Sequence, residues 1–158
     1  MSEILKDYQD LFIAVVAVAG VIFTAWIALQ NNNKNLLIKT VTEERAKWRS
    51  ELRNACAEFV KLTSEHVGNA NVTNTPRIRE LKTHLQLRLN PSQDEKHKLD
   101  QDIIQIIKDI VSGLDAAGSK QTILDNLNDL ELYVQQLLKA EWEKSKKEAK
   151  TGKLETDL

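Results

Sequence analysis

The stretch LFIAVVAVAGVIFTAWIALQ, residues 11–30, decides the fold, because it contains twenty consecutive residues without a charge. As an α-helix it would be about 30 Å long, which matches the hydrocarbon core of a bilayer. A buried helix of a soluble domain is the competing interpretation, but soluble helices of this length usually carry a polar face. The sequence therefore predicts one transmembrane helix near the N-terminus.

A cleaved signal peptide would also place an apolar stretch at this position. The residues before the stretch are acidic, however, with Glu3, Asp7 and Asp10, whereas signal peptides begin with basic residues. The stretch is also longer than the apolar region of about 7–15 residues that signal peptides contain. We therefore expect the segment to be retained as a membrane span.

Basic residues flank the span unequally, and this predicts its orientation. Only Lys6 precedes the span, whereas six basic residues follow it closely: Lys34, Lys39, Arg45, Lys47, Arg49 and Arg53. Because Lys and Arg remain on the cytoplasmic side, residues 1–10 are expected to form a short external N-terminus. The domain after the span is then expected in the cytoplasm.

Small residues recur along the span at steps of three and four, which would place them on one face of a helix. They are Ala14, Ala17, Gly20, Thr24 and Ala28. This face predicts association of copies in the membrane, although alanines are common in spans and coincidence is the alternative. In a ring of copies the face would either pack or line a narrow lumen. Its mouths would be Asp10 outside, where a carboxylate ring favours cations, and Asn31, Asn32 and Asn33 inside.

The composition of the 158 residues excludes several classes of function. The formal net charge of -1 gives no electrostatic case for direct binding of nucleic acid. A single cysteine, Cys56, provides neither a disulfide framework nor a zinc cluster, so we expect no metal or cofactor and a half-buried helical thiol. With 5 Gly and 2 Pro, the chain has little material for turns, which favours a few long helices.

The chain after the span shows helical periodicity throughout. Asn31 to Asn33 indicate a bend or a polar collar at the membrane surface. An apolar stripe then follows at steps of three and four, interrupted by Arg45, which would either reach lipid headgroups or pair with a carboxylate. The stripe contains Ile38, Val41, Trp48, Leu52, Ala55, Phe59, Leu62 and His66.

Three further helices are expected from their apolar stripes, which contain Ile78, Leu81, Leu85 and Leu89 in the second helix, Leu99, Ile103, Ile106, Ile107 and Ile110 in the third, and Ile123, Leu127, Leu130 and Val134 in the last. The second begins at Thr75-Pro76, and the third follows a capping box at Ser92-Gln-Asp-Glu95 and ends near Gly113. The last ends near Glu143 and is followed by a charged, flexible tail over residues 144–158. Residues 31–143 are therefore predicted to form a cytoplasmic four-helix bundle in an all-α protein.

One pair of residues suggests catalysis. Arg79 and His84 have the R-x4-H spacing of the HEPN ribonucleases, in which Arg binds the scissile phosphate and His assists proton transfer. The alternative is that His84 is a surface residue paired with Glu80 one turn back. His66 and His97 have no partner at ligand spacing and are expected to be solvated.

Two short motifs after the span carry a resemblance to a known group. They are TEERAKWRSELR, residues 42–53, and LQLRLNP, residues 85–91. With one N-terminal span, this layout resembles small bacterial inner-membrane proteins of phage-defence loci, and is similar to the transmembrane accessory protein of type VI-B CRISPR systems. The resemblance implies a HEPN-like bundle, a ring-shaped pore and a companion defence protein. It also implies an assembly helix that carries Arg45, Trp48, Arg49, Leu52 and Arg53.

Three functions follow from these observations. The first is a homo-oligomer that forms or gates an inner-membrane pore, depolarises the cell and acts in antiviral defence. The second is a single-span anchor or scaffold that recruits a cytoplasmic partner to the membrane. The third is a membrane-tethered HEPN-like ribonuclease; we expect no enzyme in the first two cases.

Overall fold

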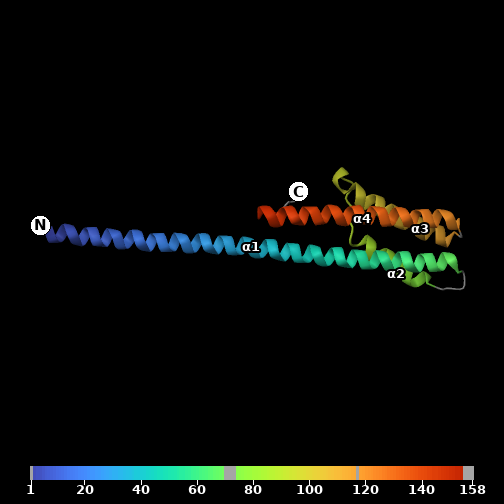
Figure 1. The fold of residues 1–158 in the computed structure, drawn as a ribbon, viewed down its shortest axis with the longest axis horizontal. Coiled ribbons are helices and arrows are strands. Elements are labelled where there is room, and N and C mark those ends of the chain that lie inside the picture. The colour runs from blue at the N-terminus through green and yellow to red at the C-terminus, as the bar shows by residue number, and fades with distance from the viewer. Residues whose placement is uncertain (1, 70–73, 117, 155–158) are drawn as a thin grey trace. The chain divides into compact units, whose positions relative to one another are not determined.

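The computed structural model describes the backbone of residues 2–69, 74–116 and 118–154, and the side chains in these ranges from residue 12 onward. All regular structure in these ranges is helical (Figure 1). The elements are α1 (Ser2–Gly68), α2 (Thr75–Gln86), the short 3-10 helix η1 (Glu95–His97), α3 (Lys98–Asp115) and α4 (Lys120–Thr151). The predicted all-α class with four helices is therefore confirmed for the described part of the chain.

The chain divides into two compact units. The first unit consists of Met1–Val41 together with Glu148–Leu158, and the second unit consists of Thr42–Lys147. Helices α1 and α4 contribute residues to both units. The two units are described separately below.

The first unit contains the apolar segment, residues 11–30. Among the described residues, α1 is the one helix that is long and apolar enough to cross a membrane, and none of its apolar window is buried within the chain. This finding argues against a core helix of a soluble domain, because such a helix would be covered by other elements. The helix continues without interruption through Asn31, Asn32 and Asn33, whose side chains are exposed.

The second unit has one hydrophobic core that receives side chains from all four α-helices. Helices share a core when their apolar residues recur every three or four positions, and the sequence shows this pattern. The core positions predicted from the pattern are confirmed where they are buried, and they include Leu52, Phe59, Ile78, Leu81, Leu85, Ile103, Ile107, Ile110, Leu127, Leu130 and Val134.

The start of α3 differs from the prediction. Ser92 and Glu95 do not form a capping box, because the Ser92 hydroxyl instead donates to Asp94 Oδ2 (2.9 Å) and accepts the Asp94 backbone N–H (3.3 Å). These local bonds form a turn, after which η1 precedes the first residue of α3, Lys98. The start of α2 is close to the prediction, with Asn74 rather than Thr75 at the N-cap.

The predicted end of the last helix near Glu143 is wrong. Helix α4 continues to Thr151, and Gly152 follows with a φ of 62°, a conformation that ends helices and favours glycine. Ser145 and Glu148 are buried, so this part of the helix has a covered face despite its many lysines. Residues 155–158 of the predicted tail, and residues 70–73 of the loop after α1, lie outside the described residues.

Candidate functional site

The small-residue face of α1 consists of Ala14, Ala17, Gly20, Thr24 and Ala28, and all five residues are exposed. A Cβ atom added at Gly20 would meet nothing within 4 Å. The Thr24 hydroxyl donates to the carbonyl oxygens of Gly20 (3.0 Å) and Val21 (2.9 Å), so its polar group is satisfied by its own helix. The face is therefore exposed, and there is open space for a side chain at Gly20. The side chain of Asp10, the predicted outer mouth of a pore, lies outside the described residues.

Three residues of the predicted assembly helix make contacts inside their own chain. Leu52 is fully buried in the core, and Trp48 Nε1 donates to the carbonyl oxygen of Arg88 (2.8 Å). Arg49 is buried, and its Nη1 donates to Ser145 Oγ (2.8 Å). A contact between copies through Arg49 or Leu52 would require the bundle to open, whereas Trp48 is half-buried. Arg45 is half-buried, and Arg53 is exposed.

Arg49 also contacts an aromatic ring of α4. Its guanidinium carbon lies 5.6 Å from the ring centroid of Trp142, and Lys146 Nζ lies 5.7 Å from the same centroid. Cations over a tryptophan ring are attracted to its negative face. Arg49 therefore joins α1 to α4 by both a hydrogen bond and a cation–π contact.

Arg79 and His84 lie near different carboxylates at the surface of the protein. Arg79 Nη2 lies 2.7 Å from Asp115 Oδ1, whereas His84 Nε2 lies 3.9 Å from Glu80 Oε1. Position 84 is five residues after position 79 on the helix, which turns the two side chains about 140° apart around the axis. His84 is an exposed surface residue one turn from Glu80, and among the described residues the structure shows no partner shared by Arg79 and His84.

A polar cluster at the turn between α2 and α3 was not predicted. His97 is not solvated as expected: its side chain is 16% exposed, its Nδ1 lies 3.9 Å from Asp100 Oδ2, and its Nε2 lies 3.1 Å from Asn90 Nδ2. Asp100 Oδ1 accepts the backbone N–H of Asn90 (3.2 Å). The spacing of three residues between His97 and Asp100 is the sequence signal that could have indicated this pair.

Burial raises the pKa of Asp100, although the Asn90 N–H and His97 act in the opposite direction. An acid whose pKa is higher in the folded protein than its usual 3.8 loses its proton first in the unfolded chain. Stability should therefore fall as pH rises from about this usual value through the raised pKa.

We expect Asp100→Asn to abolish this part of the pH dependence, since the amide keeps an acceptor for Asn90 but does not ionise. The advantage of the variant over the parent in free energy of unfolding should grow as pH rises through this window and then stay constant. Urea unfolding of the full chain in detergent between pH 3.5 and 7 measures this difference in free energy of unfolding between the variant and the parent. The control is Asp125→Asn at an exposed position of α4; equal pH profiles for parent and Asp100→Asn would contradict the expectation.

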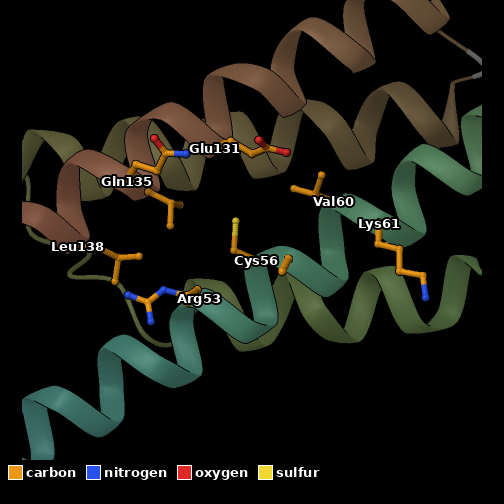
Figure 2. A pocket seen from close by; sticks show the side chains of 9 residues that line it. Arg53, Cys56, Val60, Lys61, Glu131, Gln135 and Leu138 are labelled. Carbon is orange, nitrogen blue, oxygen red and sulfur yellow. The ribbon is translucent and has the colours of Figure 1, made fainter.

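An open groove lies between α1 and α4 within the second unit, with a volume of about 490 Å³ (Figure 2). Cys56 and Val60 of α1 face α4 across its floor, and Val134 and Leu138 of α4 complete the apolar lining. Charged and polar residues form the two rims: Arg53 and Lys61 on α1, and Glu131 and Gln135 on α4. Of these features, only the burial of one cysteine was anticipated from the sequence.

Cys56 is more buried than predicted, with 5% of its surface exposed. Burial, and secondarily the charge of Glu131, raises the pKa of the Cys56 thiol to about 11. The Cys56 thiol is therefore protonated at neutral pH. Because the thiolate, and not the thiol, is the nucleophile, Cys56 is not suited to catalysis. Within the described residues no group of three or more His, Cys, Asp or Glu side chains could hold a metal ion.

No protein-family model matches the chain, and no curated protein or solved structure is similar to it. Its function therefore has to be inferred from its own residues and their arrangement.

Proposed function

We propose that the chain is a single-span protein of the bacterial inner membrane, with residues 11–30 in the bilayer and the helical bundle in the cytoplasm. The observation that carries this proposal is the exposure of large apolar side chains on every side of α1. Eleven of them lie between Phe12 and Leu29, with exposed fractions from 39% to 69%. Each such side chain costs roughly 1.5–3 kcal/mol when left in water, so lipid is the solvent that suits the segment.

Within this arrangement, copies of the chain associate through the small-residue face and form or gate a pore that depolarises the cell. The exposure of that face and the open space around a Cβ atom added at Gly20 support the proposal. Backbones approach closely where side chains are small, which is how helices associate in lipid. Asn31, Asn32 and Asn33 would stand at the inner mouth. The role in antiviral defence, with a companion protein, rests on the resemblance in layout described above.

The experiment that tests the pore is Gly20→Leu, which adds a bulky side chain to the centre of the face. We expect the variant to lose both its higher oligomers and its ability to depolarise cells on overexpression. Native mass spectrometry of the detergent-purified chain and a membrane-potential dye measure the two effects. Val15→Leu is the matched control, since Val15 is exposed and lies about 140° from Gly20 around the helix axis, away from the small-residue face.

A ring of about five or more subunits in the parent, lost in Gly20→Leu, would support the pore, because an axial lumen needs several helices. Depolarisation that persists in Gly20→Leu would contradict it.

The second candidate function is an anchor that recruits a cytoplasmic partner to the membrane. It is favoured by the intrachain use of Trp48, Arg49 and Leu52, since the bundle completes its core within a single copy. An anchor predicts a monomer or simple dimer in detergent and no depolarisation. The same mass spectra therefore separate the anchor from the pore.

A further inference from the structure

The groove between α1 and α4 leaves apolar surface open to solvent. Val60 and Leu138 are half-buried, and Ala57 beside them is exposed. The same stripe of α4 continues to Leu124, 37% exposed, and to Trp142, 52% exposed. Positions 124, 131, 135, 138 and 142 are separated by seven, four, three and four residues, which places them on one helical face. This face mixes exposed apolar side chains with Glu131 and Gln135, and exposed apolar surface with a polar rim is typical of an interaction surface.

The two rims of the groove differ in charge. Arg53 and Lys61 make the α1 rim basic, whereas Glu131 is the charged residue of the α4 rim. Lys61 lies 4.0 Å from Glu65 on its own helix, an exposed pair at the limit of an ion pair, and such pairs contribute little. A partner that binds in the groove should therefore present acidic side chains to α1 and basic side chains to α4.

A second copy of the chain meets this requirement with its own groove. In the second unit α1 and α4 run in opposite directions (Figure 1), and Glu131 lies toward the same end of the groove as Val60 (Figure 2). A two-fold axis parallel to the helices would place α1 of one copy against α4 of the other. Each residue would keep its height along the axis. Lys61 of each copy would then face Glu131 of the other, which gives two opposite-charge contacts per dimer.

We propose that this α1–α4 groove is the surface through which two copies of the bundle associate. An axis parallel to the helices leaves the two bundles pointing in the same direction. The dimer contact goes beyond the proposed pore, because it holds whether or not the apolar segments enclose a lumen. Closing the groove buries its apolar lining and pairs its rims.

The test uses full-length chains in detergent that all carry Gly20→Leu, so that association through the small-residue face does not mask the groove. We expect this background to dimerise, and expect Lys61→Glu and Glu131→Lys each to weaken dimerisation by roughly tenfold or more, since each places like charges opposite at both contacts. Analytical ultracentrifugation measures the dissociation constants. Lys108→Glu, an exposed charge reversal on α3, is the matched control and should leave dimerisation unchanged.

Mixing the two single variants gives the decisive result. A heterodimer of Lys61→Glu with Glu131→Lys restores opposite charges at both contacts, so the variants should associate with each other as well as the background associates with itself. Effects confined within one chain cannot produce this rescue on mixing. Circular dichroism checks that both variants keep the helical content of the background.

The inference is overturned if the background stays monomeric up to roughly 100 µM, which would leave the groove to another protein or to lipid. It is also overturned if the single variants dimerise normally, or if mixing them gives no heterodimer. Loss of the groove dimer alone would leave the pore proposal standing, since that proposal is tested by Gly20→Leu in the otherwise natural chain.

Discussion

A chain carrying both Val16→Asp and Val21→Asp is expected to be lost from the membrane fraction. Each aspartate near the centre of a span costs about 2.5–3.5 kcal/mol in insertion, and each removed valine forfeits a further favourable contribution of about 0.3 kcal/mol or more. Both side chains are exposed on α1, at 53% and 67%, so no other element of the chain shields them from lipid. The measurement is the fraction of protein that resists carbonate extraction of isolated membranes.

The matched control carries two aspartates on the same helix outside the apolar segment, Ala46→Asp and Ser50→Asp, at exposed positions. It should remain in the membrane fraction. If the Val16→Asp, Val21→Asp chain stays as firmly integrated as the control, residues 11–30 do not form the anchor.

The second large effect concerns the core of the bundle. Phe59 is fully buried, and truncating it to alanine should destabilise the bundle by about 3–5 kcal/mol, through lost apolar burial and the cavity left behind. Chemical unfolding followed by far-ultraviolet circular dichroism, in detergent, measures the change in the unfolding midpoint.

The control for Phe59→Ala is the same substitution at Phe23, which lies in the apolar segment and is 60% exposed. Because Phe23 contributes nothing to the bundle core, Phe23→Ala should leave the unfolding midpoint of the bundle unchanged. Equal shifts of the unfolding midpoint for the two variants would show that Phe59 does not belong to the core of the bundle.

Much of the fold could be predicted because apolar periodicity dominates it. The predicted apolar stripes lie in the core, since helix packing buries residues spaced by three and four. They include Leu52, Phe59, Ile103, Ile107 and Leu127. Charged residues were predicted less well. Arg49 was expected in assembly, yet it is buried against α4, because a guanidinium can be covered when hydrogen bonds and an aromatic ring surround it.

The remaining errors share one physical cause, which is that polar side chains find partners that a pattern of apolar residues does not reveal. His97 lies against Asn90 and Asp100 rather than in solvent, and Ser92 bonds locally instead of capping α3. The helical end of α4 was missed because its lysines mask the covered positions Ser145 and Glu148. The α1–α4 groove depends on how two helices distant in sequence meet, which periodicity within each helix does not specify.

We propose that residues 11–30 cross the membrane once, with the N-terminus outside and the bundle in the cytoplasm. The most direct test of this proposal labels single cysteines in intact cells with a membrane-impermeant maleimide, in a Cys56→Ser background. We predict that Ser2→Cys is labelled in intact cells, whereas Lys153→Cys is labelled only after the cells are lysed. Labelling of Lys153→Cys in intact cells, or protection of Ser2→Cys, would contradict the account.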